Sequence, residues 1–115
     1  HSKLMHGAEK EFGNFLREIP FREPARPVIH NCTAEFSPSD PDEIREIMKN
    51  QLCNPVKWYD SVQKLMEMQV RNYVEIGPGK VLTGLVKKIL PKDAEVSFFS
   101  VNSLKALESF FQEVS

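Results

Sequence analysis

Residues 72–85 read NYVEIGPGKVLTGL, and this stretch decides the class of fold. Its first five residues have the β-branched and aromatic composition of a short strand. The break Gly77-Pro78-Gly79 ends that strand, and apolar residues then recur from Leu82 to Ile89 at the spacing of one helix face. Strands that alternate with helices pair in parallel and carry the helices on their faces, so the stretch predicts an α/β fold.

The same alternation continues on both sides of this stretch. We expect about three short parallel-type strands, at residues 28–31, 72–76 and 96–101, with about five helices packed on them. The third helix carries Gln69 as its one polar member. The helices are expected where apolar residues recur at helical spacing, beginning near Met5, Ile44, Trp58, Leu82 and Leu104.

Helix-capping signals set the expected boundaries. Asp40 suits the cap of the second helix, Pro41 its first position, and Glu43 completes a capping-box arrangement. Asn54-Pro55 repeats the cap-then-proline signal for the third helix. Ser103 is expected to cap the last helix.

Length and composition exclude several functional classes. The chain has 115 residues, 41% of them hydrophobic and 27% charged, which fits one globular domain over residues 1–115 with no internal boundary. A net charge of -1 gives little support to a nucleic-acid partner, and no apolar run approaches the ~20 residues of a membrane span. Cys32 and Cys53 are interpreted as buried free thiols in a reducing cytosol, and a disulfide is the lesser alternative. No Cys-x-x-Cys or paired-histidine motif predicts a metal site.

Two loops lie where the strands of an open α/β sheet end, which is where such sheets bind ligands. One is the corner at residues 51–56 and the other is residues 77–80. Glycines and a lysine before a helix can bind phosphate, but the P-loop spacing is absent, so a tight turn is the favoured interpretation. His6, near the solvent side of its helix, and His30, in a strand, are expected to be structural or surface residues.

Four segments carry a resemblance: HSKLM (1–5), VIHNCT (28–33), QLCNPVKW (51–58) and VEIGPGKVLTGL (74–85). In order and spacing they resemble the motifs His-Ser-x-Leu-Met, Pro-Val-x-x-Asn-x-Thr, Gln-Leu-x-x-Pro-Val-x-Trp and Glu-Ile/Val-Gly-Pro-Gly-x-x-Leu. These motifs are typical of the malonyl-CoA:acyl carrier protein transacylases of bacterial fatty-acid synthesis. The chain is similar to the C-terminal part of their hydrolase-like acyltransferase core, beginning at the active-site histidine.

The resemblance implies transfer of a malonyl group from coenzyme A to the phosphopantetheine thiol of acyl carrier protein through a serine acyl-enzyme. It makes His1 the general base, and it makes the backbone carbonyl of Gln51 the acceptor for the imidazole Nδ1–H. Malonyl-CoA is then a substrate, no cofactor is implied, and the expected location is the cytoplasm.

This chain departs from the family pattern in one respect. It contains neither the G-x-S-x-G serine elbow nor the arginine that pairs with the malonyl carboxylate, both of which precede the histidine in the family. With no initiator Met, it is expected to be a piece of a longer protein. We therefore expect it to be inactive alone, to need the upstream segment of the same protein, and to leave its inner helix faces partly bare.

Two alternatives stay open at this point. One is a non-catalytic α/β binding module that docks a partner through its Phe- and Met-rich helix faces. The other is the acyltransferase domain of a larger polyketide or fatty-acid synthase. Gln51 and Gly77-Pro78-Gly79 favour the separate enzyme, because synthase domains tend to differ at both places.

Overall fold

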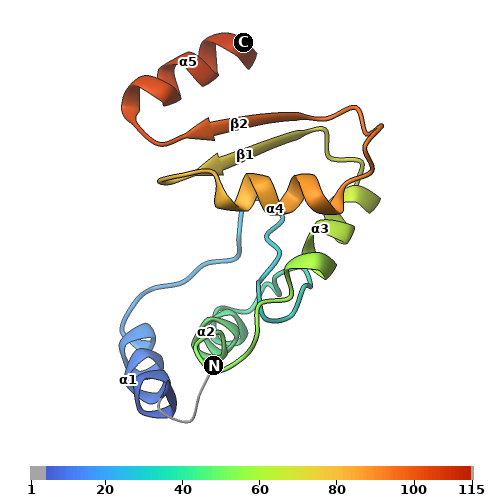
Figure 1. Cartoon of the computed structure of the whole chain (residues 1–115). Helices are drawn as coiled ribbons and strands as arrows, with labels where there is room; N and C mark the ends of the chain where they lie inside the picture. Colours follow the sequence, from blue (N-terminus) through green and yellow to red (C-terminus); the bar gives the residue numbers. More distant parts are fainter. Residues whose placement is uncertain (1–4, 115) are drawn as a thin grey trace. The chain divides into compact units, whose positions relative to one another are not determined.

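The computed structural model describes residues 5–114, which form five helices and two strands (Figure 1). The α/β class and the five helices are confirmed, but the described residues contain two strands, where the sequence predicted about three. The chain divides into two compact units between Ser61 and Val62. No helix among the described residues is both long and apolar enough to cross a membrane.

The first unit is built on a pair of helices, α1 (Met5–Arg17) and α2 (Pro41–Asn50). Leu16 on α1 and Ile44 on α2 are buried. The Lys49 side chain lies over Gly13, where a Cβ would be 2.8 Å from it. The helix pair therefore packs on a narrow apolar contact, with the Lys49 side chain lying against the α1 backbone at Gly13.

Arg45 closes the C-terminal end of α1. Its Nε donates to the Leu16 carbonyl at 3.0 Å, and one terminal nitrogen donates to the Ile19 carbonyl at 2.7 Å. The other terminal nitrogen binds Asp42 at 2.8 Å, and the guanidinium lies 5.0 Å from the centre of the Phe21 ring. Carbonyls at a helix end have no intrahelical partner. Arg45 gives a donor to the Leu16 carbonyl, which also accepts from the Ile19 N–H, and to the Ile19 carbonyl two residues beyond α1.

The strand expected at residues 28–31 is wrong. Its backbone folds back on the following residues, with Ser37 N–H donating to the Val28 carbonyl at 2.8 Å and Ala34 N–H to the His30 carbonyl at 2.9 Å. The result is a single antiparallel bridge between Ile29 and Phe36. The carbonyls of Val28 and His30 are thus bonded to nearby residues of the same loop. They are not available to pair with a neighbouring strand, so the segment does not join the parallel sheet.

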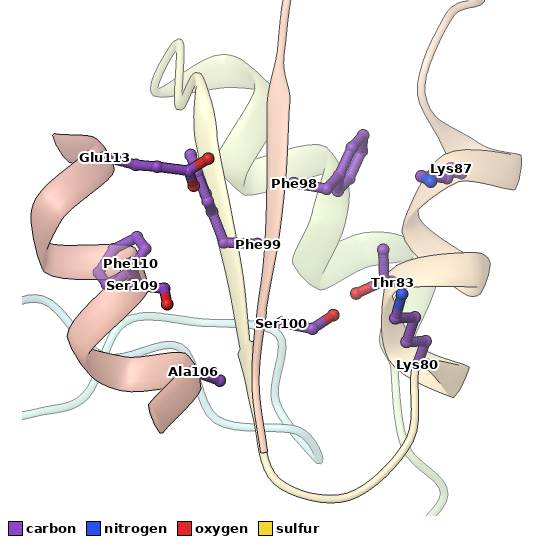
Figure 2. Close-up of a pocket in the computed structure, with 10 residues that line it drawn as sticks. All are labelled: Lys80, Thr83, Lys87, Phe98, Phe99, Ser100, Ala106, Ser109, Phe110 and Glu113. Carbon is purple, nitrogen blue, oxygen red and sulfur yellow. The ribbon is translucent and has the colours of Figure 1, made fainter. Parts of the chain in front are cut away.

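The second unit holds the parallel pair β1 (Asn72–Ile76) and β2 (Ser97–Val101), as predicted, with Asn72 opposite Ser97. The helices α4 (Val81–Ile89) and α5 (Leu104–Val114) follow β1 and β2. Side chains of β2 alternate between them, since Phe98 points toward α4 and Phe99 toward α5 (Figure 2). The Phe99 and Phe110 rings meet edge to face at 5.1 Å.

Two of the predicted caps are confirmed. The Asp40 side chain accepts from the Glu43 N–H at 3.3 Å, with Pro41 at the first position of α2. The Ser103 hydroxyl accepts from the Ala106 N–H at 3.1 Å. Each side chain satisfies one of the N–H groups that a helix start leaves without a partner.

Two boundary predictions at α3 (Trp58–Glu67) are wrong. Asn54 does not cap its start, because the Asn54 side-chain amide donates instead to the Asn50 carbonyl at 2.6 Å and closes α2. Gln69 is not part of α3, because it has a φ of 59° and, with Val70, terminates the helix through bonds to the carbonyls of Met66 and Leu65. This pairing is the Schellman motif, which here uses a glutamine in place of the usual glycine.

The expected bare helix faces are present in the second unit. On the helices, Leu104 is 80% exposed and Val81 is 73% exposed, and Ile76 at the end of β1 is also 80% exposed, although all three are large and apolar. None of the described residues of α5 is buried, including those that the sequence pattern assigned to its inner face. Apolar surface of this kind marks a place where further protein packs.

Replacing Arg45 with Met tests its role in closing α1. The substitution keeps the apolar stem but removes the Arg45 donors, which leaves the Ile19 carbonyl without this bond and the Leu16 carbonyl with only the Ile19 N–H. We expect the free energy of unfolding to fall by about 1–3 kcal/mol, measured by urea denaturation. The control is Arg26→Met, at an exposed position, which should change stability little. Equal losses from both variants would contradict the role given to Arg45.

Candidate functional site

The corner after α2 holds Gln51, one of the two predicted catalytic positions. Gln51 has φ -60° and ψ -27°, and its N–H donates to the Ile47 carbonyl at 3.2 Å. Cys53 N–H donates to the Asn50 carbonyl at 3.2 Å, beside the Asn54 amide bond to the same carbonyl. At the far end, Lys57 N–H donates to the Asn31 carbonyl at 2.7 Å. Hydrogen bonds on both sides therefore fix the backbone of the corner.

His1, the other predicted catalytic residue, lies outside the described residues. Its contact with the Gln51 carbonyl stays a prediction. Gln51 belongs to the first unit and the turn at residues 77–80 to the second.

The turn after β1 needs its glycines. Gly77 has a φ of +132° and Gly79 a φ of +77°, values that residues with a Cβ rarely adopt. The Gly77 N–H donates to the Val101 carbonyl at 3.0 Å, so the turn begins while it is still tied to β2. Since β1 and β2 are parallel, their carboxyl ends meet at one edge of the sheet.

The Glu75 carboxylate caps α4 across this turn. It accepts from the N–H groups of Leu82 at 3.3 Å and Thr83 at 2.9 Å, and from the Thr83 hydroxyl at 2.7 Å. Backbone N–H groups at a helix start are where a phosphate would bind. The protein's own carboxylate occupies that position, which favours the tight-turn interpretation over phosphate binding.

These contacts also alter the acidity of Glu75. Hydrogen bonds from the Thr83 side chain and backbone lower the pKa of the Glu75 carboxyl below its ordinary value of 4.5. Sequence reasoning had noted Glu75 only as a motif residue. The signal for its role is a carboxylate two residues before a glycine turn, with a hydroxyl residue in the first turn of the next helix.

A hollow of about 460 Å³ lies along β2 between α4 and α5 (Figure 2). It combines two lysines with hydroxyl groups and aromatic rings, and Lys87 Nζ lies 5.1 Å from the centre of the Phe98 ring. Sequence analysis had not singled it out, although Lys80, Thr83 and Lys87 share one helix face at spacings of three and four. Its lining residues are Lys80, Thr83, Lys87, Phe98, Phe99, Ser100, Ala106, Ser109, Phe110 and Glu113.

The remaining histidines and cysteines follow the expectations in part. Cys32 and Cys53 are free thiols, as predicted, but both are only partly buried, and His6 is exposed. Burial lowers the pKa of His30, whose Nε2 is buried without a partner, which indicates a neutral structural ring. A hydrogen bond to Glu9 raises the pKa of the Cys53 thiol.

Comparison with known proteins gives a consistent result. No protein-family model matches the chain. It is 34% identical over 110 residues to a malonyl CoA-acyl carrier protein transacylase of Staphylococcus aureus, covering 96% of this chain and 34% of that protein. It is 40% identical over 97 residues to the polyketide biosynthesis protein ThaF of Burkholderia thailandensis, covering 84% of this chain and 8% of that protein. A malonyl-transacylase solved with its type II PKS acyl-carrier protein superposes with a TM-score of 0.83 at 34% identity, over 98% of this chain and 35% of that one.

The chain has a parallel α/β unit with a glycine turn at the carboxyl edge of its strands, and it superposes closely on a solved malonyl-transacylase. It is therefore a protein of the acyltransferase fold. Within that class, 96% of the chain is homologous to malonyl CoA-acyl carrier protein transacylases. It spans about one third of the length of those relatives.

Replacing Glu75 with Gln tests the cap of α4. A carboxyl whose pKa is lowered by folding stabilises the protein above its unfolded pKa, and this stabilisation is lost as the pH falls through the folded value. We expect Glu75→Gln to be less stable than the parent at pH 7, and the difference to shrink below about pH 4.5. Urea midpoints across this range give the measurement. The exposed Glu95→Gln is the control, and a pH profile of Glu75→Gln parallel to that of the parent would refute the cap.

Proposed function

We propose that this chain supplies the base-bearing part of an enzyme that transfers malonyl groups from coenzyme A to acyl carrier protein. The observation that carries the proposal is the match, over 96% of the chain, to a protein named malonyl CoA-acyl carrier protein transacylase. The fixed corner at Gln51 and the glycine turn after β1 support it, because both lie in segments that resemble family motifs.

His1 is proposed as the general base. It takes the proton of a serine hydroxyl while the serine oxygen attacks the malonyl thioester, and it returns the proton to the departing coenzyme A thiolate. In the second half it takes the proton of the carrier-protein thiol, whose sulfur attacks the acyl-enzyme, and it gives that proton to the departing serine oxygen. That serine lies outside this chain, since no G-x-S-x-G occurs in the sequence.

Gln51 is proposed to hold the imidazole through its backbone carbonyl. A neutral carbonyl fixes the tautomer and orientation of the ring, though it stabilises an imidazolium less than a carboxylate does. The hydrogen bond from Gln51 N–H to the Ile47 carbonyl supports this role, because it fixes the peptide from the backbone side. The Gln51 side chain then matters less than its position.

Acyl carrier protein is the proposed partner, in bacterial fatty-acid synthesis in the cytoplasm, and the transfer needs no cofactor. The solved complex of a malonyl-transacylase with an acyl-carrier protein supports this partner. The similarity to ThaF favours a second candidate, the same transfer to a carrier protein of polyketide synthesis. A non-catalytic binding module is not favoured, since the similarity to transacylases runs through nearly the whole chain.

The purified 115-residue chain should transfer no malonyl group on its own. A base without a nucleophile forms no acyl-enzyme. With malonyl-CoA and a carrier protein present, mass spectrometry of the carrier should detect malonylation only after the serine-bearing upstream segment of the same protein is added. Transfer by the chain alone would overturn the proposal. Parallel reactions with fatty-acid and polyketide carrier proteins separate the two candidates.

In the assembled enzyme, the two site residues should respond differently to substitution. His1→Ala should lower kcat by a thousandfold or more, on the order seen when a catalytic histidine is removed. Gln51→Ala should cost less than about tenfold, because it keeps the backbone carbonyl. Steady-state kinetics give both values, and equal losses would show that the role of Gln51 is misassigned.

A further inference from the structure

Three side chains with metal-ligating chemistry meet in the first unit. His6 and Glu9 come from α1, and Cys53 comes from the turn after α2. Their ligand atoms all lie within 4.8 Å of one another, and Cys53 Sγ is 3.7 Å from His6 Nδ1. His6 and Cys53 are 47 positions apart in the sequence, so the fold alone brings them together.

The scaffold around this cluster positions all three side chains. His6 and Glu9 are three residues apart on a helix, so they project from the same face. Cys53 is held by its N–H bond to the Asn50 carbonyl, and Asn54 donates to that carbonyl as well. The three ligands therefore sit on hydrogen-bonded backbone rather than on a free loop.

The distances suit a four-coordinate ion. Zinc binds sulfur at about 2.3 Å and imidazole nitrogen at about 2.0–2.1 Å, which puts tetrahedral ligand atoms roughly 3.2–3.7 Å apart. The 3.7 Å between sulfur and nitrogen already matches this spacing. The other ligand atoms lie within 4.8 Å of one another, so small side-chain rotations bring them to the tetrahedral spacing.

We propose that His6, Glu9 and Cys53 form a binding site for one zinc-like divalent cation, with a fourth position open to water. A thiolate with an imidazole and a carboxylate suits zinc or cobalt, whereas magnesium and calcium prefer oxygen ligands alone. Binding breaks the S–H bond of Cys53, forms a sulfur–metal bond and releases one proton to solvent. The ion joins α1 to the turn after α2, two residues beyond Gln51, and does not take part in the proposed acyl transfer.

Cobalt(II) added to the full 115-residue chain under reducing conditions tests the site. The wild type should develop the near-ultraviolet charge-transfer absorption of a sulfur–cobalt bond, saturating at one equivalent, and zinc should abolish it. Cys53→Ser should lose this band. Cys32→Ser is the matched control and should keep it, because the Cys32 thiol donates to the Ile47 carbonyl and lies outside the cluster.

Two further variants test the other ligands. Loss of a residue that only supports a metal ligand lowers metal affinity by roughly 10–100-fold. His6→Gln and Glu9→Gln each remove a ligand itself, so each should weaken cobalt binding by more than this. Unchanged circular dichroism spectra show that the variants still fold. Zinc should also raise the melting temperature of the wild type and of Cys32→Ser, but not that of Cys53→Ser. Absence of the sulfur–cobalt band in the wild type, its survival in Cys53→Ser, or unchanged affinity in His6→Gln would each overturn the proposal.

Discussion

The second unit depends on one carboxylate that occupies the start of a helix. Glu75 binds the first turn of α4 from across the glycine turn, and these hydrogen bonds hold the end of β1 to the start of α4. Gly77 is tied in addition to Val101 at the end of β2. A helix start leaves N–H groups without partners and carries partial positive charge, so an internal anion stabilises it directly. Because the Glu75 carboxylate occupies the N–H groups at the start of α4, these groups are not available to a ligand. The glycine turn therefore has a structural role.

Arg45 has the complementary role in the first unit, where a cation closes a helix end that carries partial negative charge. Both units thus rely on one charged side chain that satisfies backbone groups, and neither has a large apolar core. The described residues that are buried and apolar are few, and large side chains such as Ile76 and Leu104 remain exposed. With little apolar burial, the hydrogen bonds at helix ends make a larger contribution to holding each unit together.

The spacing of apolar residues in the sequence predicted the helices and the two paired strands. The five helices, β1 and β2 follow from apolar spacing, and the caps at Asp40 and Ser103 follow from short-range chemistry. The errors at residues 28–31, at Asn54 and at Gln69 share a cause, since in each a local hydrogen bond competed successfully with a regular element. At the candidate site, the motif at residues 51–58 predicted Gln51 and the corner that contains it. The contacts of Glu75 with Thr83, and of Cys53 with His6, join residues that only the folded chain brings together.

The exposed apolar residues of the second unit bear on how a complete site would be assembled. Ile76 and Val81 flank the glycine turn, and Leu104 follows β2, so all three lie near the carboxyl ends of the two strands. That edge is where open α/β sheets bind ligands. Relatives about three times as long have the additional residues to cover such a surface. Burial of these side chains by such residues would remove apolar surface from water, so the second unit would gain stability from protein outside this chain.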